Sequence, residues 1–492
     1  MGNAKLTGQI ECAWPAGFGS WASRVEASPT LCRSERDVPW RLRPPGIEEV
    51  RQVVMEAARN RTPLWPISTG RNWGYGSHLP ARDGSVILDL GALDSIGDLD
   101  RPSLSVRIGP GVTQAALHAY LQRNAPDLAL NVTGSGGTTS VLGNALERGI
   151  GYGGEKDTEV YAMEVVLADG SLVGPSAGRN HKSRTHPAGL SQDGLFFQSG
   201  LGIVVGARIR LRLRQEAEEA VVIQGTLDGV MGTLKAAYDG RLIPVPTHVS
   251  EPGRTQRLGF GMLRNLWQRD PTPAEVSACF PEHSTYNALF PISGRRRVVN
   301  ATWKELKAAA AGGVKFRRAD SAKIAGAAKL LGLVGAKNAS TRLLAIRPLL
   351  ALTWGEPSEV GLASLDGYRG GDPDRASRGA IYGNAVSSVG ADEARRASGI
   401  VRKLWKDSAF TWIILDSRCM VTIYTLHFDD ADASKVHAAN AAIVEELTRC
   451  GLPLYRAGIN VPVPVGADPV GRLVKEALDP LGIIAPGRYP SP

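Results

Sequence analysis

From about residue 46 to residue 215, short apolar runs alternate with polar turns that contain glycine, a pattern typical of strands connected by a few helices. Apolar residues recur at helical spacing between positions 50 and 58, behind an acidic first turn, which predicts a helix from about residue 46. Asp169-Gly170 follows an apolar run and predicts a hairpin turn into residues 171–173. Strands are also predicted at 63–67, 86–90, 105–108, 128–132, 163–167 and 203–213, and a second helix at 114–122.

The pattern changes between residues 215 and 450. Residues 308–349 are rich in Ala, Lys, Leu and Gly and predict irregular helical structure, and 366–380 form a polar, glycine-rich loop that we expect to be mobile. Helices are predicted at 391–404 and 431–450, with two strands between 411 and 428. Because 492 residues exceed what one hydrophobic core usually fills, the two patterns indicate at least two domains.

The net charge of +9 raises the question of a nucleic-acid partner. Lysines and arginines are spread along the chain, with only short clusters such as 295–297, and no nucleic-acid-binding module accompanies them. We therefore expect no nucleic-acid partner, since an anionic cofactor accounts for the charge equally well. Arginines at 208, 210, 212 and 214 alternate with apolar residues, and we expect them to form the solvated face of a strand.

The five cysteines are scattered and lack CxxC spacing, which argues against a disulfide framework and against a metal site. The N-terminal residues 1–17 contain no apolar core of a secretion signal and no myristoylation pattern. A run of about 18 apolar residues is absent from the sequence, so we expect no membrane partner and a cytosolic protein.

Residues 66–77, PISTGRNWGYGS, form a Ser/Thr/Gly loop directly after a predicted strand. Backbone N–H groups freed by glycine, with short hydroxyls beside them, make a concave site for an anion such as a pyrophosphate. The loop matches neither GxxxxGK[ST] nor GxGxxG, the two commonest nucleotide motifs. A strand-ending loop without a ligand is the alternative.

A second loop, TGSGGTTSVLGN at 133–144, holds four glycines and five hydroxyl residues in twelve positions. It cannot pack a core, although it lies between two apolar runs, so we favour a ligand over a flexible surface loop. Two other segments pair glycine with apolar strand residues: 193–205, which leads into a core strand, and 478–488 near the C-terminus.

Four segments in this order, PLWPISTGRNWGYG, SVLGNALERGIGY, DGLFFQSGLGIV and DPLGIIAPG, resemble the FAD-binding domain of the vanillyl-alcohol oxidase / para-cresol methylhydroxylase family. The resemblance covers about residues 40–215 and 450–490. It implies an α+β fold, namely a two-domain flavoprotein with a discontinuous FAD-binding domain of the para-cresol methylhydroxylase (PCMH) type and an α+β cap domain. The FAD-binding domain would comprise 1–214 and 450–492, and the cap 215–449.

The resemblance also implies FAD as the cofactor and a small aromatic substrate, and it allows a homodimer. The first loop would hold the pyrophosphate. The residues assigned to FAD are Ser68, Thr69, Gly70, Arg71, Asn72, Gly74, Tyr75, Gly76, Ser77, Thr133, Gly134, Ser135, Gly137, Thr138, Ser140, Gly143, Asn144, Gly149, Gly202, Ile203, Val204 and Arg456.

Three residues fall on the family's phenol-binding positions: Tyr75 inside GRNWGYG, and the pair Tyr455-Arg456 late in the chain. Two tyrosyl hydroxyls and a guanidinium would lower the pKa of a bound phenol. Electron release from the phenolate would then make hydride loss from the para-benzylic carbon feasible, so we expect these three residues to be catalytic. An ordinary loop tyrosine and a surface arginine are the alternatives.

The chain also departs from the family pattern. Gly134 or Ser135 stands where family oxidases place a carboxylate near flavin N5, so the handling of protons is open. The position that carries covalent FAD should fall near residue 380, but Gly379-Ala380 stand there and Tyr382 is out of phase. Asn72 replaces the histidine of the other attachment pattern, and His78 lies beyond the loop, so we expect non-covalent FAD.

The resulting hypothesis is FAD-dependent oxidation of a para-substituted phenol or related benzylic substrate. An FAD enzyme that acts on a non-phenolic alcohol or amine in a biosynthetic pathway is the first alternative. A basic ligand-binding protein without redox activity is the second. The electron acceptor, oxygen or another, stays open.

Overall fold

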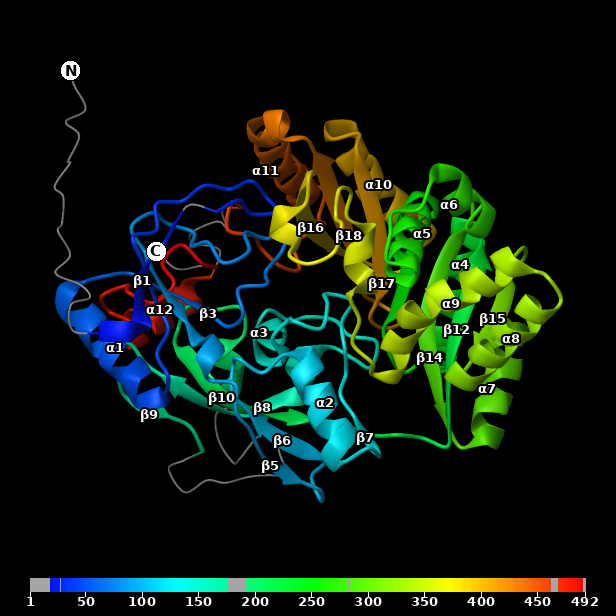
Figure 1. Cartoon of the computed structure of the whole chain (residues 1–492). Helices are drawn as coiled ribbons and strands as arrows, with labels where there is room; N and C mark the ends of the chain where they lie inside the picture. The colour runs from blue at the N-terminus through cyan, green and yellow to red at the C-terminus, as the bar shows by residue number, and fades with distance from the viewer. Residues whose placement is uncertain (1–17, 27, 176–191, 282–283, 462–467, 490–492) are drawn as a thin grey trace.

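Two groups of β-strands, one from each half of the chain, build the molecule, with helices around and between them (Figure 1). The computed structural model describes residues 18–26, 28–175, 192–281, 284–461 and 468–489. The predictions for residues 1–17, Cys12 included, lie outside these ranges. Within them, no helix has the length and apolar character that crossing a membrane requires.

The first half of the chain forms a four-stranded sheet in the order β1-β2-β4-β3 and a five-stranded sheet in the order β5-β6-β10-β8-β9, while β7 pairs with β11. Strand β4 is parallel to β2 and β3, and the five-stranded sheet is antiparallel. The elements are β1 (Ala22–Arg24), β2 (Trp40–Leu42), α1 (Ile47–Asn60), β3 (Leu64–Ile67), β4 (Val86–Asp89), β5 (Ile96–Asp100), β6 (Ser105–Ile108), α2 (Gln114–Asn124), β7 (Leu128–Ala129), α3 (Val141–Leu146), β8 (Val160–Val166), β9 (Leu172–Val173), β10 (Ile203–Arg210) and β11 (Arg212–Leu213).

The second half forms one antiparallel sheet in the order β15-β12-β14-β13-β17-β18-β16. Its elements, with the C-terminal helix, are β12 (Ala217–Gly225), α4 (Leu227–Asp239), β13 (Thr247–Ser250), α5 (Pro252–Trp267), α6 (Pro273–Cys279), β14 (Tyr286–Gly294), α7 (Arg296–Ala308), β15 (Lys315–Ala319), α8 (Ser321–Leu333), α9 (Lys337–Ala351), β16 (Gly379–Ser387), α10 (Ala391–Leu404), β17 (Ser408–Ile414), β18 (Met420–Phe428), α11 (Ala433–Arg449) and α12 (Pro469–Leu478).

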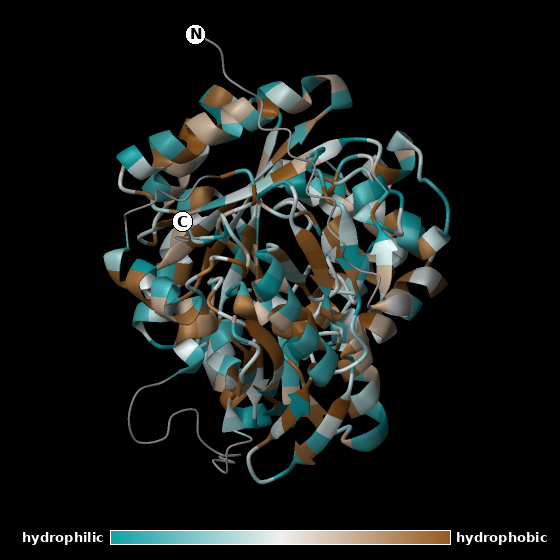
Figure 2. Cartoon of the chain, turned by 90° about the vertical axis from the view of Figure 1, so that its left-hand side faces the viewer, coloured by the Kyte–Doolittle hydropathy of each residue, from teal (hydrophilic) through white to brown (hydrophobic). Residues whose placement is uncertain are grey.

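The two faces of this seven-stranded sheet have different roles, because successive side chains of a strand point to opposite faces. In β17, Phe410, Trp412 and Ile414 pack into the apolar core that α4, α10 and α11 cover. Thr411 and Ile413, between them, line a cavity on the other face. Figure 2 shows hydrophobic strands inside and hydrophilic positions on the outer helices. The sheet therefore offers one face to a ligand.

The C-terminal segment returns to the first half of the chain, as the expected discontinuous FAD-binding domain requires. Leu64 in β3 donates its backbone N–H to Ile483 at 2.7 Å and accepts from Ala485 at 2.8 Å. Lys475 of α12 is buried and donates to Asp479 at 2.7 Å. A buried charge that lies beside an opposite one is stable where an unpaired one is not. Lys475 also donates to the backbone carbonyl of Gly200 at 2.7 Å, which connects the tail to the first half of the chain.

Several local predictions are confirmed. The helix from about residue 46 is α1, the helix predicted at 391–404 is α10, and β9 pairs with β8 through the Asp169-Gly170 turn. The predicted solvated arginine face is wrong for Arg208, which is buried and donates to Ser105 at 3.0 Å and to Asp98 at 2.9 Å. Strand β10 lies in the middle of its sheet, so the charged side chain of Arg208 is paired inside the protein and does not face solvent.

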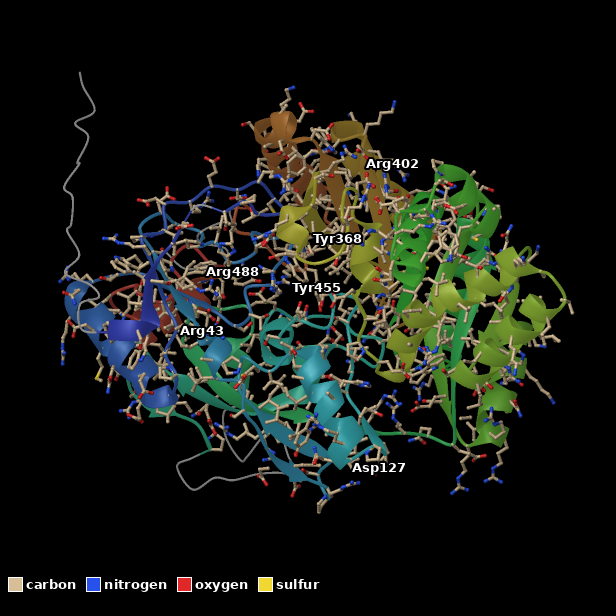
Figure 3. All side chains as sticks on the ribbon, in the orientation of Figure 1. Arg43, Asp127, Tyr368, Arg402, Tyr455 and Arg488 are labelled. Carbon is tan, nitrogen blue, oxygen red and sulfur yellow. The ribbon has the colours of Figure 1, made fainter. Side chains whose placement is uncertain are left out.

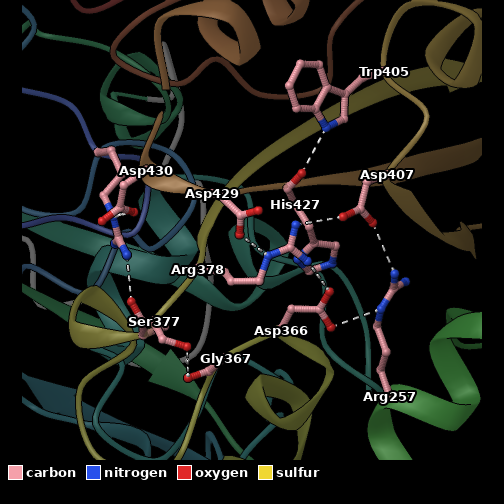
Figure 4. Close-up of polar contacts among 12 residues, drawn as sticks. Arg257, Asp366, Gly367, Ser377, Arg378, Trp405, Asp407, His427, Asp429 and Asp430 are labelled. Atoms are coloured by element: carbon pink, nitrogen blue, oxygen red, sulfur yellow. Dashed lines mark hydrogen bonds and ion pairs between the residues drawn. The ribbon is translucent and has the colours of Figure 1, made fainter. Parts of the chain in front are cut away.

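The loop at 366–380, which its composition predicts to be mobile, has ion pairs near both of its ends. Asp366 accepts from Arg378 at 2.9 Å and from Arg257 at 3.1 Å, and Asp407 binds the same two arginines (Figure 4). The cluster connects the loop to α5 and to the segment between α10 and β17. Opposite charges at these distances attract one another and fix the ends of the loop.

Candidate active site

A cavity of about 500 Å³ lies between the loops of the first half of the chain and the open face of the seven-stranded sheet. From the first half it is lined by residues of both glycine-rich loops, and from the second half by β13, α5, β16, β17 and β18. In Figure 3, Tyr455 lies near the middle of the molecule, between the blue-to-cyan first half and the yellow-to-orange strands. The site thus combines segments more than 300 residues apart in sequence, as the 2.9 Å hydrogen bond between Tyr382 N–H and Gly74 O illustrates.

The first loop adopts the conformation that its glycines permit. Gly70 has φ +69°, which L-residues with a Cβ rarely adopt. The backbone N–H groups of 70–72 have no hydrogen-bond partner among the described residues. From the second half of the chain, Asp374 accepts from Ser77 Oγ at 2.5 Å and from Leu31 N–H at 2.7 Å. The loop is therefore held from outside, while its own donors remain available to an anion.

The second loop packs against the first. Ser140 is the N-cap of α3, accepting from Gly143 N–H at 2.9 Å, and its own N–H donates to Thr69 Oγ1 at 3.3 Å. A Cβ at Gly143 would lie 2.2 Å from Ser68 Oγ, so only glycine permits this approach. The two loops form one continuous wall of the cavity.

These walls fit FAD. The cavity is large, its loops present unpaired backbone donors, and two buried polar atoms that line it, Asn144 Oδ1 and Arg488 Nη1, have no hydrogen-bond partner among the described residues. Unpaired buried polar atoms are uncommon unless a ligand satisfies them. The predicted FAD residues that line the cavity are Ser68, Thr69, Gly70, Arg71, Asn72, Tyr75, Ser77, Thr133, Gly134, Ser135, Ser140, Gly143, Asn144, Gly149, Gly202, Ile203, Val204 and Arg456.

Four of the predicted FAD residues do not line it: Gly74, Gly76, Gly137 and Thr138. Gly74 lies against the Tyr382 side chain and Gly76 against that of Ile459, where a Cβ would come within 2.3 Å and 2.4 Å respectively. These two glycines let other parts of the chain approach the loop. A glycine pattern alone cannot distinguish that role from contact with a ligand.

Tyr75 and Arg456 come together through a residue that the sequence did not single out, Asn384 of β16. Asn384 Oδ1 accepts the backbone N–H groups of Tyr455 and Arg456 at 2.9 and 2.8 Å, and its Nδ2 donates to Tyr75 Oη at 3.1 Å. The Tyr75 oxygen already accepts, so its O–H can donate into the cavity. Burial raises the pKa of Tyr75, even though Arg456 opposes the shift, so the donor keeps its proton.

Arg456 is fixed on three sides. Its Nη2 donates to Asn72 Oδ1, its Nε lies 3.2 Å from Glu147, and its guanidinium lies 4.5 Å from the centre of the Tyr75 ring. Burial would raise the pKa of Glu147, but the charges of Arg488 and Arg456 prevail and lower it to about 2. The ionised Glu147 therefore orients both arginines at the cavity wall.

Tyr455 lines the cavity, but its hydroxyl is already engaged. It donates to the backbone carbonyl of Arg148 at 2.8 Å. Burial, with Glu155 and Asp157 nearby, raises the pKa of Tyr455. Of the predicted trio, the structure thus brings Tyr75 and Arg456 together and directs the Tyr455 hydroxyl away from them.

The region of the missing carboxylate holds hydroxyls. Thr133 Oγ1 and Ser135 Oγ lie 2.6 Å apart on the cavity wall. Glu359 accepts from Gly137 N–H at 2.6 Å but does not line the cavity. No carboxylate other than Glu147 is among the described residues that line it, and Glu147 is held by two arginines.

The cavity is also lined by Tyr152, His248, Arg254 and Tyr382, and of these four His248 and Arg254 were missed by sequence reasoning. His248 stacks on Tyr152 with ring centres 4.1 Å apart. A signal was present, because His248 and Ser250 flank Val249 at strand spacing in a predominantly apolar sheet. Polar residues that alternate with core residues on a buried strand indicate a face that does not pack against a core.

Comparison with known proteins shows an FAD binding domain and two enzymes similar over most of the chain. Residues 41–174 match the FAD binding domain family. A decarboxylase of Chondromyces crocatus, 1'-carboxy-chondrochloren decarboxylase, is 29% identical, over 95% of this chain and 93% of that protein. The 4-cresol dehydrogenase (hydroxylating) flavoprotein subunit of Pseudomonas putida is 24% identical, over 90% of this chain and 86% of its own length.

The fold agrees with that of a solved structure. The 4-ethylphenol oxidase of Gulosibacter chungangensis, in its isoeugenol complex, superposes with a TM-score of 0.78 at 21% identity, over 94% of this chain and 91% of that one. The likeness covers both halves of the chain, so this solved structure shares the overall fold.

Proposed function

We propose that this chain, which belongs to the vanillyl-alcohol oxidase / para-cresol methylhydroxylase family of FAD-dependent enzymes, is an oxidase or dehydrogenase that acts on a para-substituted phenol. The observation that carries the proposal is the pairing of Tyr75 with Arg456 at the cavity wall, where Asn384 leaves the Tyr75 O–H free to donate. FAD, when bound, supplies a two-electron acceptor that takes a hydride at N5. The loops at 68–77 and 133–144 would hold it.

The chain's own contribution is to stabilise the phenolate. The substrate oxygen would receive the O–H of Tyr75 and lie close to the Arg456 guanidinium, whose positive charge favours the ionised form. Electron release from that oxygen into the ring stabilises the cation that forms when a hydride leaves the para-benzylic carbon. Because both donors are fixed before the substrate binds, no reorganisation is needed as charge develops.

Anaerobic reduction of the flavin by paired substrates tests this function. We expect 4-ethylphenol to bleach the flavin, and 4-ethylanisole, whose phenol is capped as a methyl ether, to leave it oxidised. The ether has the same ring and the same benzylic carbon, but it cannot form a phenolate. Equal rates of bleaching by both compounds would contradict phenolate activation and favour the oxidation of a non-phenolic alcohol or amine.

A second candidate function is oxidative decarboxylation, which the name of the Chondromyces crocatus relative describes for that protein. The observation in its favour is Arg254, a half-buried arginine that lines the far wall of the cavity. After hydride loss, a carboxylate on the carbon next to the benzylic position can leave as CO2. Its bonding electrons then form the C=C bond and return the ring to a phenolate. Release of CO2 in step with flavin reduction would distinguish this outcome from simple oxidation.

We further propose that the FAD is bound non-covalently. Ala380 is buried and can form no bond to the cofactor, and His78 does not line the cavity. Acid precipitation should therefore leave the flavin in the supernatant, measured by its absorbance. A yellow pellet after washing would contradict the proposal and would indicate attachment through Tyr382, which does line the cavity.

A further inference from the structure

The far wall of the cavity holds a positive charge without a partner. Arg254, in the first turn of α5, lines the cavity, and its guanidinium donates to Ser250 Oγ at 3.3 Å. It forms no ion pair with a carboxylate of the described residues. Glu251 is close in sequence, but its carboxylate is occupied by Arg402 and by the N–H of Phe410 at 2.9 Å. Four of the five N–H donors of Arg254 therefore lack a partner among the described residues.

The titratable groups that line the cavity beside Arg254, namely His248, Tyr152 and Tyr382, are neutral. Burial, helped by the charge of Arg254, lowers the pKa of His248 to about 3, so its imidazole is uncharged at neutral pH. Burial raises the pKa of Tyr152 to about 12 and also raises that of Tyr382, so both remain phenols. His248 Nε2 is buried and has no hydrogen-bond partner among the described residues, and both tyrosines line the same cavity. This wall thus combines one positive charge with several neutral polar groups.

A buried charge that lacks a counter-ion is unfavourable, and an anion of the ligand restores the balance. One guanidinium surrounded by neutral donors matches a single negative charge on two oxygens, which describes a carboxylate. Tyr382 links this wall to the proposed phenolate site, since its ring centre lies 5.9 Å from that of Tyr75. The two anion-binding groups therefore face the same cavity from different walls.

We propose that Arg254, with the hydroxyls of Ser250, Tyr152 and Tyr382, binds a carboxylate on the substrate's para side chain, so that the substrate is a hydroxyaryl carboxylic acid. This assignment rests on the proposed oxidation for the position of the ring. The carboxylate site itself is independent of that oxidation, because it would bind an acid whether or not the acid is oxidised.

Binding of compounds that lack the phenol tests the site apart from the reaction. In the FAD-loaded enzyme, dissociation constants are measured by calorimetry for phenylalkanoates with one to four methylene groups, and for the matching amides. We expect at least one acid to bind about 10- to 100-fold more tightly than its amide, the range for a charge-assisted hydrogen-bonded pair. The Arg254→Met substitution should weaken the binding of the acid by about that factor and leave the binding of the amide unchanged.

Arg264→Met is the matched control, because Arg264 lies on the same helix, pairs with Asp270 at 2.8 Å and does not line the cavity. It should change neither dissociation constant. If acids and their amides bind to the wild-type enzyme with equal dissociation constants, that result alone overturns the assignment. The assignment would also be overturned if Arg254→Met lost affinity for neutral phenols by the same factor as for the acids. That result would place the phenolate at Arg254.

The two proposals fail in different ways. If 3-phenylpropionate binds in an Arg254-dependent manner while 3-(4-hydroxyphenyl)propionate does not reduce the flavin, the carboxylate site stands and the proposed oxidation fails. If 4-ethylphenol reduces the flavin while the acids show no preference over the amides, the oxidation stands and the carboxylate site fails.

Discussion

Replacing Gly70 by valine is expected to abolish FAD binding. Gly70 has φ +69°, and a Cβ there would lie 3.2 Å from His78 Cβ, so a β-branched side chain forces the loop to move. The movement would displace the N–H groups of 70–72 that we assign to the pyrophosphate. The measurement is the ratio of flavin to protein absorbance after gel filtration, which should fall to near zero.

Gly84→Val is the matched control for this change. Gly84 has nearly the same backbone conformation, φ +75°, but no atom lies within 4 Å of its added Cβ, and it does not line the cavity. The Gly84→Val variant has a similar backbone strain at a position outside the cavity, so its flavin content should remain that of the wild-type enzyme. A Gly70→Val protein that still binds stoichiometric FAD would show that the loop does not hold the cofactor.

Arg456→Lys should slow anaerobic flavin reduction by a para-alkylphenol by about 10²- to 10³-fold, although the charge is retained. The planar guanidinium simultaneously binds Asn72, lies beside Glu147 and stacks on Tyr75. An ammonium group is a single point charge and cannot keep these contacts while it also faces the substrate. Stopped-flow measurement of flavin bleaching gives the rate, and the flavin content shows whether the cofactor is retained.

Companion variants distinguish catalysis from general damage. Arg418→Lys changes an exposed arginine and should leave the rate unaltered. Tyr75→Phe removes the free O–H donor but keeps the ring beneath Arg456, and should slow reduction by less than Arg456→Lys. Tyr455→Phe should have the smallest effect, since the Tyr455 hydroxyl donates to Arg148. A wild-type rate in Arg456→Lys with full flavin content would refute the role of Arg456.

Much of the local structure was predictable from sequence, because short-range patterns express short-range physics. The amphipathic spacing of α1 and α10 and the Asp169-Gly170 turn determine backbone conformation within a few residues. The two glycine-rich loops are recognisable because glycine and hydroxyl residues between apolar strands cannot pack a core. Both loops line the cavity, as their composition suggested.

The composition of these loops did not reveal which of their glycines face the cavity. Gly74 and Gly76 accommodate Tyr382 and Ile459, which come from distant parts of the chain. Arg208 was predicted to be exposed, yet it is buried because its strand is central in the sheet. Burial depends on which strands become neighbours, and strand order is a property of the whole fold.

By itself, then, the sequence determined local elements such as α1, α10, the Asp169-Gly170 turn and the two glycine-rich loops, since each depends on residues close together along the chain. The tertiary structure decided which side chains meet. Asn384 orients Tyr75 and the 455–456 backbone from a strand about 300 residues away from Tyr75, and Arg254 is left unpaired because its neighbour Glu251 is bound by Arg402. Hydrogen bonds and ion pairs between distant residues form only where packing brings them within about 3 Å, and no local pattern encodes that meeting.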